Sequence, residues 1–277
     1  MDPDTSPIKY ESHIDLSNRN NSHTAVIELV QELRRGPLRV LEVGCSSGYM
    51  GAAIRAFGHH VVGVEPAQAA ALVAQSVLDA AFCGTLQAFA QTAPRKHFDV
   101  ITLADVLEHM ADPAEALRLC QDLLAPGGHV VISVPNVTHG SLRAMLLDGR
   151  WEYQELGILD RTHLRFFSRR ELLETFSRAG FVVRDLRRTL APVTHGLEGL
   201  DPPIDSRVIE LVSACARDDD VESYQFVASL QEREATGGVD VNAQWLTAKL
   251  PRFGAPPWHE RMVPTRWRAI ARLAAQR

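Results

Sequence analysis

The sequence predicts an α/β fold in which a doubly wound, mostly parallel sheet is covered by helices on both faces. Short apolar, β-branched runs alternate with Ala- and Leu-rich segments from about residue 24 to residue 187. This alternation, with short connections, is typical of parallel strands joined by crossover helices. Breaker residues, such as those of "APGG", separate the elements. A ligand of such a sheet is expected beyond the carboxyl ends of its strands.

The predicted strands are recognised by their apolar and β-branched composition. Four of them have the character of fully buried parallel strands: residues 38–44, 59–66, 98–104 and 129–135. Strand character returns later in the chain, at residues 181–187 and 223–231. The last of these segments alternates like a strand that could join the same sheet.

Helices are expected between these strands, at residues 67–80, 113–124 and 168–180. The second helix has Asp112 at the capping position and Pro113 at the first helical position. In the third helix, Ser168 and Glu171 have the spacing of a capping box, and Gly180 ends the helix.

The composition excludes several classes of protein. The chain of 277 residues has a formal net charge of -5, which argues against a nucleic-acid partner. Its four cysteines are scattered, as expected of free thiols in a reducing compartment. The polar, acidic amino terminus does not resemble a signal peptide, and no apolar run approaches the roughly 20 residues of a membrane span. We therefore expect a cytoplasmic protein.

The segment "VLEVGCSSGYMGAAI" places glycines where a buried strand turns into a helix. Gly44 permits a tight turn, and Gly48 permits a close approach of the backbone to a ligand. Glu65 ends the next strand, 21 residues after Gly44, where an acidic side chain can accept hydrogen bonds from both ribose hydroxyls of an adenosine. Glycine turns after strands also occur in purely structural roles, and it is the combination with Glu65 that favours a cofactor site. The dinucleotide fingerprint G-x-G-x-x-G is absent.

The loop residues Glu42, Gly44 and Gly48 resemble the motif of the class I S-adenosylmethionine-dependent methyltransferases, with Ser46 in place of the central glycine. The similarity covers about residues 24–187 and includes "FDVITLADVLEHM", "LLAPGGHVVISVPN" and "HLRFFSRRELLETFSRAGF". It is closest to the branch of ubiquinone-biosynthesis-like and sugar O-methyltransferases. The resemblance implies a Rossmann-like, seven-stranded sheet and S-adenosylmethionine as the cofactor.

The resemblance assigns these residues to the cofactor: Glu42, Gly44, Cys45, Ser46, Gly48, Glu65, Pro66, Thr85, Leu86, Ala104 and Asp105. Glu65 would hold the ribose, and the glycine loop would pass under the methionine portion. The family often has an acidic residue after the third strand to bind the adenine amino group, but this chain has Thr85 and Leu86 there. Adenine recognition is then expected from backbone groups or from the threonine hydroxyl. The Cβ of Ser46 should slightly alter the approach of the loop to the cofactor.

The segment "LADVLEHM" brings Asp105, Glu108 and His109 together after a buried strand. Such charges can belong to a solvated first helical turn, where acids meet the positive end of the helix dipole. Their position at the carboxyl edge of the sheet instead favours a reaction centre. Asp105 and His109 would share one face if the turn is helical. In related methyltransferases this region lines the pocket between methionine and acceptor.

A later segment, "ILDRTHLRFFS", contains Asp160, Arg161 and His163 and by resemblance closes over the acceptor. Some methyltransferases of this branch, and the small-RNA-end methyltransferases, bind a divalent metal with an acid-x-x-Glu-His turn and a later histidine. The resemblance thus assigns Mg²⁺ or Mn²⁺ to the following ligands: Asp105, Glu108, His109 and His163. Mixed carboxylate and imidazole ligands suit Mn²⁺ or Zn²⁺ more readily than Mg²⁺. The metal-free alternative makes His109 or His163 the general base.

Three regions are predicted along the chain: an amino-terminal lid (1–23), a methyltransferase domain (24–235, with an insertion at about 188–220) and a basic carboxyl-terminal extension (236–277). The lid is inferred from the resemblance, and Tyr10 and His23 could face the pocket from it. In the extension, Trp258 and Trp267 lie among arginines. This extension could contact an anionic membrane surface, although packing on the domain is the simpler interpretation.

These features predict an enzyme that transfers the methyl group of S-adenosylmethionine to a hydroxyl oxygen by in-line displacement. His109 and His163 are the predicted catalytic residues. The expected acceptor is a sugar hydroxyl in a glycan or a glycosylated metabolite, and the alternative is a quinone-type phenol or another small-molecule hydroxyl. A non-catalytic cofactor-binding module of the same fold is the second alternative. An RNA 3′ end is disfavoured because the main domain has no basic stripe, and the sequence predicts no particular oligomeric state.

Overall fold

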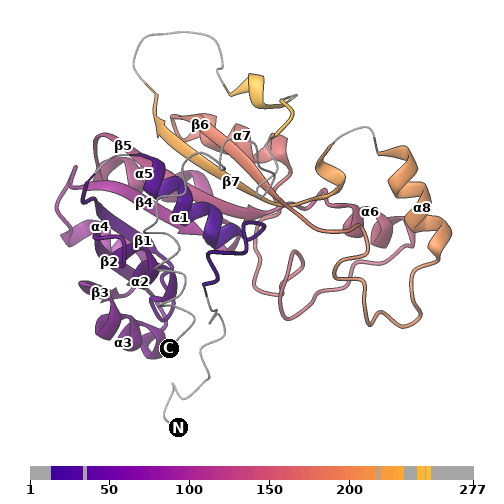
Figure 1. Ribbon diagram of the computed structural model, residues 1–277, viewed down its shortest axis with the longest axis horizontal. Helices are drawn as coiled ribbons and strands as arrows, with labels where there is room; N and C mark the ends of the chain where they lie inside the picture. Colours follow the sequence, from indigo (N-terminus) through magenta and orange to yellow (C-terminus); the bar gives the residue numbers. More distant parts are fainter. Residues whose placement is uncertain (1–13, 34–35, 217–218, 234–241, 247, 251–277) are drawn as a thin grey trace.

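A seven-stranded sheet forms the centre of the computed structural model (Figure 1), which describes residues 14–33, 36–216, 219–233, 242–246 and 248–250. The strand order is β3-β2-β1-β4-β5-β7-β6. The strands are β1 Arg39–Val43, β2 His60–Glu65, β3 Ala80–Cys83, β4 Phe98–Ala104, β5 Leu124–Pro135, β6 Phe181–Leu190 and β7 Ser223–Glu232. β7 is antiparallel to both of its neighbours, and the other described strand pairs are parallel. The predicted doubly wound, mostly parallel sheet is confirmed.

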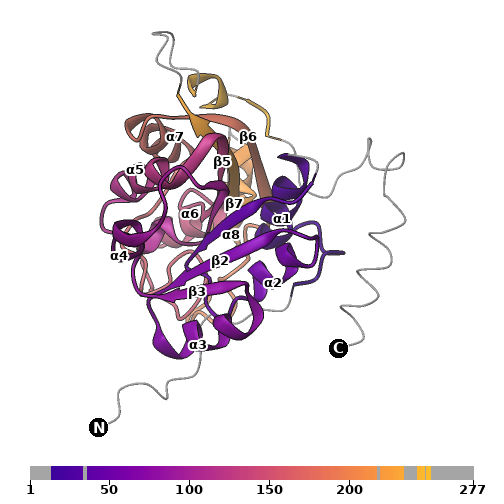
Figure 2. The same ribbon diagram turned by 90° about the vertical axis from the view of Figure 1, so that its left-hand side faces the viewer.

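Helices cover both faces of the sheet, as Figure 2 shows. One face packs against α1 Ser22–Leu33, α2 Tyr49–Arg55 and α3 Gln68–Val77, and the other packs against α4 Leu86–Thr92, α5 Pro113–Leu123 and α7 Arg169–Arg178. Side chains alternate along each strand and therefore supply both cores. In β1, Val40 belongs to the core of the first face and Leu41 to the core of the second.

Local sequence signals fix several element boundaries. The Asp112 carboxylate accepts a hydrogen bond from the Glu115 N–H at the start of α5, and the Ser168 hydroxyl accepts one from the Glu171 N–H at the start of α7. Both predicted caps are confirmed. The helix predicted at residues 67–80 ends earlier, at the end of α3, because the chain already enters β3. β5 begins earlier than predicted, since residues 124–128 continue the strand across a register shift in its pairing with β4.

A separate lobe surrounds α6 Gly140–Leu147 and α8 Ser206–Cys215, which lie together at one side of the molecule (Figure 1). Its small core contains the buried side chains Leu142, Met145, Ile158 and Leu159, with Leu200 and Ile204 packed against them. The predicted insertion at about residues 188–220 supplies only part of this lobe. The rest comes from the chain between β5 and α7.

The edge strand β6 pairs with side-chain amides from both ends of the described chain. Asn20 accepts a hydrogen bond from the Leu190 N–H at 2.7 Å and donates one to the Leu190 carbonyl at 2.8 Å. Asn242 accepts from the Val183 N–H at 2.9 Å and donates to the Phe181 carbonyl at 3.1 Å. These contacts satisfy backbone groups that an edge strand would otherwise offer to another chain.

Replacing Asn242 by alanine is expected to lower the free energy of unfolding by about 2–4 kcal/mol, because two backbone groups of the edge strand lose their partners. Asn242 is 1% exposed, so water cannot replace its amide. Asn20→Ala is the matched control, and its exposed site should limit the loss to less than about 1 kcal/mol. Urea unfolding followed by circular dichroism measures both variants. Equal, small losses would contradict the role given to Asn242.

The start of the carboxyl-terminal extension packs on the domain. Arg169 of α7 donates a hydrogen bond to the Ala248 carbonyl at 2.8 Å, and Leu250 is buried in the core. The predicted membrane contact concerns Trp258 and its neighbours, which lie outside the described residues, as does Tyr10 of the predicted lid. Among the described helices, none is both long and apolar enough to cross a membrane.

Candidate active site

The carboxyl ends of the parallel strands open into a cavity of about 1080 Å³. Residues that end or follow four strands form much of its wall: Gly44 and Ser46 (β1), Glu65 (β2), Thr85 (β3) and Asp105 (β4). β1 lies between β2 and β4, at the reversal of strand order where doubly wound sheets bind their ligands. The volume is at the upper end of the range for one small molecule, so the cavity has room for a donor and an acceptor together.

The loop after β1 adopts left-handed backbone conformations, with φ of +68° at Gly44, +48° at Ser46 and +82° at Gly48. A Cβ at Gly44 would lie 2.7 Å from a methyl group of Val106, so glycine is required at this tight turn, as predicted. A Cβ at Gly48 would lie 2.8 Å from a methyl group of Val77. The space beside Gly48 is therefore occupied by α3. Glycine is needed at this position because α3 packs closely against it, and the prediction that it makes room for a ligand is wrong.

The carboxylate of Glu65 is fixed in the wall of the cavity by two backbone groups. Its Oε2 accepts a hydrogen bond from the Ser46 N–H, and its Oε1 accepts one from the Ala67 N–H, both at 2.9 Å. The side chain thus joins the loop after β1 to the start of α3. Glu65 is 9% exposed. Each carboxylate oxygen has a further lone pair. The geometry suits an acceptor of two ligand hydroxyls, and binding of a ribose by Glu65 remains a prediction.

Three predicted cofactor-binding residues, Glu42, Cys45 and Gly48, are not among the described residues that line the cavity. Glu42 lies under α2, where a Cβ on Gly51 would be 2.2 Å from its Oε2. Burial raises the pKa of Glu42 to about 8. Cys45 is 1% exposed and packs against Gly63. These residues support the loop from beneath.

The remaining predicted cofactor residues do line the cavity: Pro66, Thr85, Leu86 and Ala104, beside Gly44, Ser46, Glu65 and Asp105. Thr85 is the N-cap of α4, and its hydroxyl accepts a hydrogen bond from the Ala88 N–H at 3.2 Å. Its hydroxyl proton can be donated in addition. A polar contact to a purine at this position remains a prediction for Thr85.

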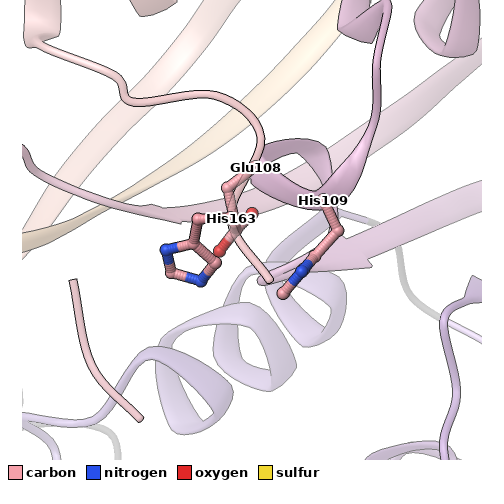
Figure 3. Close-up of side chains that lie close together, drawn as sticks. All are labelled: Glu108, His109 and His163. Atoms are coloured by element: carbon pink, nitrogen blue, oxygen red, sulfur yellow. The ribbon is translucent and has the colours of Figure 1, made fainter. Parts of the chain in front are cut away.

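A cluster of Glu108, His109 and His163 lies in the wall of the same cavity, and the side chains converge on a common space in Figure 3. One ligand atom from each residue lies within 4.8 Å of the others. Backbone hydrogen bonds bring the two segments together, because the N–H groups of Leu164 and Arg165 both donate to the Glu108 carbonyl, at 2.7 and 3.0 Å. Three of the four predicted metal ligands therefore meet.

The protonation of the cluster follows from its partners. Nδ1 of His109 lies 3.2 Å from the Thr162 carbonyl, and Nδ1 of His163 lies 2.9 Å from the Ile158 carbonyl. Since a carbonyl can only accept, Nδ1 of each ring is the donor in these contacts, and Nε2 is the ring nitrogen that can act as a ligand or an acceptor. Burial, followed by the nearby His163, lowers the pKa of His109. Burial raises the pKa of Glu108 well above its ordinary value, and among the described residues neither of its carboxylate oxygens has a hydrogen-bond partner.

Asp105, the fourth predicted ligand, lies outside this cluster. The expectation that it shares a helical face with His109 is wrong, because only residues 107–109 form a short 3-10 turn and Asp105 has a left-handed φ of +54°. Its Oδ1 accepts a hydrogen bond from the Gln225 amide of β7 at 2.8 Å. Its N–H is held by Ser133 of β5. The carboxylate is thus directed at β7 and α1 instead of at the two histidines.

Sequence reasoning missed several residues of the wall. Tyr49, Tyr224 and Gln225 line the cavity without having been predicted. The last two arrive on the antiparallel strand β7, and no local motif marks them. Tyr49 directly follows the glycine loop, which is a signal that could have been used. His23, expected only as a residue that could face the pocket, does line it.

Comparison with known families gives this geometry a context. The family described as "Methyltransferase domain" matches residues 17–186, which is more than half of the 277 residues. The chain belongs to this methyltransferase family. The match covers the glycine loop, Glu65 and the Glu108–His109–His163 cluster, and it confirms the resemblance to class I S-adenosylmethionine-dependent methyltransferases.

Curated relatives of this methyltransferase include the ubiquinone biosynthesis O-methyltransferases. The protein from Aeromonas salmonicida is 29% identical over 155 residues, which are 53% of this chain and 64% of that protein. The protein from Stutzerimonas stutzeri is 32% identical over 157 residues, which are 53% of this chain and 66% of that protein. The matched segment thus spans just under two thirds of the length of these relatives.

Solved structures support the fold of this methyltransferase. An S-adenosylmethionine-dependent methyltransferase from Archaeoglobus fulgidus superposes with a TM-score of 0.55 at 18% identity, covering 78% of this chain and 97% of the other. A structure described as the [4+2]-cyclase SpnF superposes with a TM-score of 0.51 at 16% identity, covering 76% and 81%. At such identities the likeness concerns the fold alone, and activity has to be argued from the site.

Proposed function

We propose that this protein transfers a methyl group from S-adenosylmethionine to a hydroxyl oxygen. The observation that carries the proposal is one cavity that contains both a nucleoside-type wall, with Glu65 beside the left-handed glycine loop, and the Glu108–His109–His163 cluster. In-line transfer requires that donor and acceptor meet in one space with the reacting atoms aligned. The sulfonium supplies an already activated methyl group, so the protein has to position the reactants and make the acceptor oxygen nucleophilic.

For the donor, Glu65 accepts the ribose hydroxyls, and Thr85 and Leu86 face the adenine. Gly44 and Ser46 lie along the amino-acid end. These assignments rest on the positions of the side chains in the wall of the cavity and on the two backbone hydrogen bonds that fix the Glu65 carboxylate. A carboxylate fixed in this way needs no rearrangement when the ribose binds, so little side-chain conformational entropy is lost on binding.

For the acceptor, we favour a phenolic hydroxyl of a quinone-type ring. The curated relatives are named ubiquinone biosynthesis O-methyltransferases. Apolar side chains surround the cluster on the acceptor side of the cavity: Met110, Leu156, Ile158 and Leu164. Such a wall suits a flat apolar ring better than a sugar, whose several hydroxyls would each need a partner. The sugar hydroxyl expected from the sequence finds no support in these relatives, and we replace it with the phenol.

The cluster also fits a divalent cation. The two oxygens of Glu108 are buried and find no hydrogen-bond partner in the part of the chain that the structure describes, and buried polar atoms of folded proteins rarely remain so. His109 and His163 each use Nδ1 on a backbone carbonyl, which is the common arrangement of metal-binding histidines, so Nε2 of each ring would be the ligand atom. We assign Mn²⁺ or Mg²⁺ to Glu108, His109 and His163, without Asp105. A cation bound there supplies a Lewis acid that lowers the pKa of a hydroxyl oxygen.

When no cation is bound, His109 is the group that receives the acceptor's proton. Burial and the nearby His163 lower the pKa of His109, which favours the neutral imidazole, and a neutral imidazole can serve as a base. The two imidazole rings lie at 74° to each other with centroids 4.8 Å apart. At this separation the rings pack directly against each other, so we expect the two histidines to act as one unit.

A methyl-transfer assay tests this function. The protein is incubated with S-adenosylmethionine that carries a deuterated methyl group and with two panels, alkyl-substituted catechols and nucleotide sugars, and products are detected by mass spectrometry. We expect labelled methyl ethers from the catechols. Products from the sugar panel alone would overturn the phenol assignment. Binding of S-adenosylmethionine with no product from either panel would instead favour the non-catalytic module.

A further inference from the structure

The hydroxyl group of Tyr224 is a polar group in the wall of the cavity that the chemistry proposed above does not use. Tyr224 is the second residue of β7 and lines the cavity together with Gly157 and Ile158. A Cβ built on Gly157 would lie 3.2 Å from the Tyr224 hydroxyl oxygen, so the hydroxyl is directed at Gly157. Within the described part of the chain, this hydroxyl has no hydrogen-bond partner.

The contacts of Tyr224 place its hydroxyl on the same side of the cavity as the Glu108–His109–His163 cluster. Ile158 directly follows Gly157, and its carbonyl oxygen lies 2.9 Å from Nδ1 of His163. Tyr224 and Ile158 also pack in the same small core, that of the lobe around α6. The Tyr224 hydroxyl and the His163 ring therefore contact adjacent residues of one segment.

Two histidines hold the Tyr224 ring in this orientation. The ring meets the imidazole of His139 edge to face with centroids 5.5 Å apart, and it meets that of His195 in the same way with centroids 4.8 Å apart. His139 is buried, and its Nε2 lies 3.1 Å from the Ala191 carbonyl. Neither histidine is among the described residues that line the cavity. Their influence on a ligand in the cavity therefore passes through Tyr224.

The Tyr224 hydroxyl is a hydrogen-bond donor at neutral pH. Burial, followed by the negative charges of Asp105 and Glu198, raises the pKa of Tyr224, so the phenol keeps its proton. A phenol hydroxyl can donate one hydrogen bond and accept others. A site that hydrogen-bonds an oxygen of its substrate discriminates against analogues without that oxygen, because its own polar group is then left unpaired.

We infer that Tyr224 donates a hydrogen bond to a second oxygen of the acceptor ring, while the oxygen that is methylated lies at the Glu108–His109–His163 cluster. The inference rests on the proposed function and adds a specificity-determining residue to it. Since Tyr224 and His163 contact adjacent residues, the two oxygens are neighbours on the ring. The preferred acceptors then carry two neighbouring oxygens. His195 is a positioning residue that acts through the Tyr224 ring.

Calorimetric titration with two ring compounds tests the inference. The protein is saturated with S-adenosylhomocysteine and titrated, in the presence of Mn²⁺, with 4-propylcatechol and with 4-propylphenol, which lacks the second oxygen. The unmodified protein should bind the catechol more tightly. Tyr224→Phe should reduce this preference by about threefold to tenfold, as expected for the loss of one hydrogen bond. Tyr153→Phe, at an exposed tyrosine that is not among the residues lining the cavity, is the matched control and should keep the preference.

A second variant keeps the inference open to refutation if Tyr224→Phe does not fold, which a loss of S-adenosylhomocysteine binding would reveal. His195→Ala removes a ring that supports Tyr224 and should reduce the same preference by about twofold to fivefold. His60→Ala, at an exposed histidine of β2, is its control. Equal weakening of both ring compounds, or an unchanged preference in both variants, would overturn the inference. If the unmodified protein methylates catechols but binds the two compounds equally well, the inference fails while the proposed function stands; if it binds neither compound and forms no product, the proposed function fails as well.

Discussion

Replacing Glu108 by glutamine is expected to lower methyl transfer by about 100-fold or more while S-adenosylmethionine binding changes little. Glu108 is 1% exposed, and its carboxylate lies beside the two histidines without a hydrogen-bond partner from any described residue. Glutamine has nearly the same shape but cannot supply a negative charge to a cation. Steady-state turnover on the catechol panel and calorimetry with S-adenosylhomocysteine measure the two effects. Glu174→Gln, at an exposed glutamate of α7, is the control.

The pH dependence of cation binding provides a second test of the role given to Glu108. Burial raises the pKa of Glu108 well above its ordinary value, and burial together with His163 lowers the pKa of His109. The raised pKa of Glu108 favours its protonated form when no cation is bound, and the lowered pKa of His109 favours its neutral form. Cation binding must then release the Glu108 proton, so the affinity for Mn²⁺ should fall as the pH is lowered. Calorimetry in buffers of different ionisation enthalpy counts the released protons, and Glu108→Gln should release fewer.

The histidines belong to the same test. His109→Ala and His163→Ala should each lower turnover by about 100-fold, and the double variant should lose much less than the product of the two effects, because groups that act as one unit are not additive. Chelation should abolish turnover, and Mn²⁺ or Mg²⁺ should restore it. Full turnover in the presence of a chelator would show that the reaction needs no cation, and a histidine would then be the base. Near-normal turnover in Glu108→Gln and in both alanine variants would remove the cluster from the reaction.

The sequence was sufficient for those parts of the fold and site that depend on local pattern. The turn at Gly44 and the acid at Glu65 are two ends of one strand–helix–strand unit, so their spacing along the chain determines their meeting in space. The caps at Asp112 and Ser168 are equally local, because each side chain bonds a backbone group three residues away. The pairing of His163 with the Glu108 turn is not local, and it was predicted only through the resemblance to a family.

The sequence did not predict side-chain positions that depend on an unusual backbone conformation or on contacts with a distant strand. Asp105 has the residue type and spacing of a ligand on a helix, but its left-handed φ of +54° separates it from His109. Gln225, which holds Asp105, comes from the antiparallel strand β7, 120 residues away. His23 reaches the cavity from α1, whose position depends on packing against the sheet and on the contact of Asn20 with β6. Each of these contacts depends on tertiary packing, which periodicity and motif spacing do not encode.

Replacing Glu65 by glutamine is expected to weaken S-adenosylmethionine binding by at least about tenfold, since two charge-assisted hydrogen bonds to ribose are each worth about 1.5–3 kcal/mol. This substitution has a second effect besides the loss of charge, because the Glu65 carboxylate also accepts hydrogen bonds from the backbone. Both oxygens of Glu65 accept from N–H groups, of Ser46 and of Ala67. Glutamine has only one acceptor oxygen, so its amide group must face one of the two N–H donors. The loop after β1 or the start of α3 then has to move.

The second readout of Glu65→Gln is therefore the stability of the ligand-free protein. One backbone N–H loses its acceptor, which should lower the free energy of unfolding by about 1–3 kcal/mol, whereas a residue that touched only the ligand would leave stability unchanged. The same variant should weaken 5′-methylthioadenosine as strongly as S-adenosylhomocysteine, because both carry the ribose. An unchanged dissociation constant for both probes, in a folded protein, would remove Glu65 from the cofactor site and with it the assignment of the glycine loop.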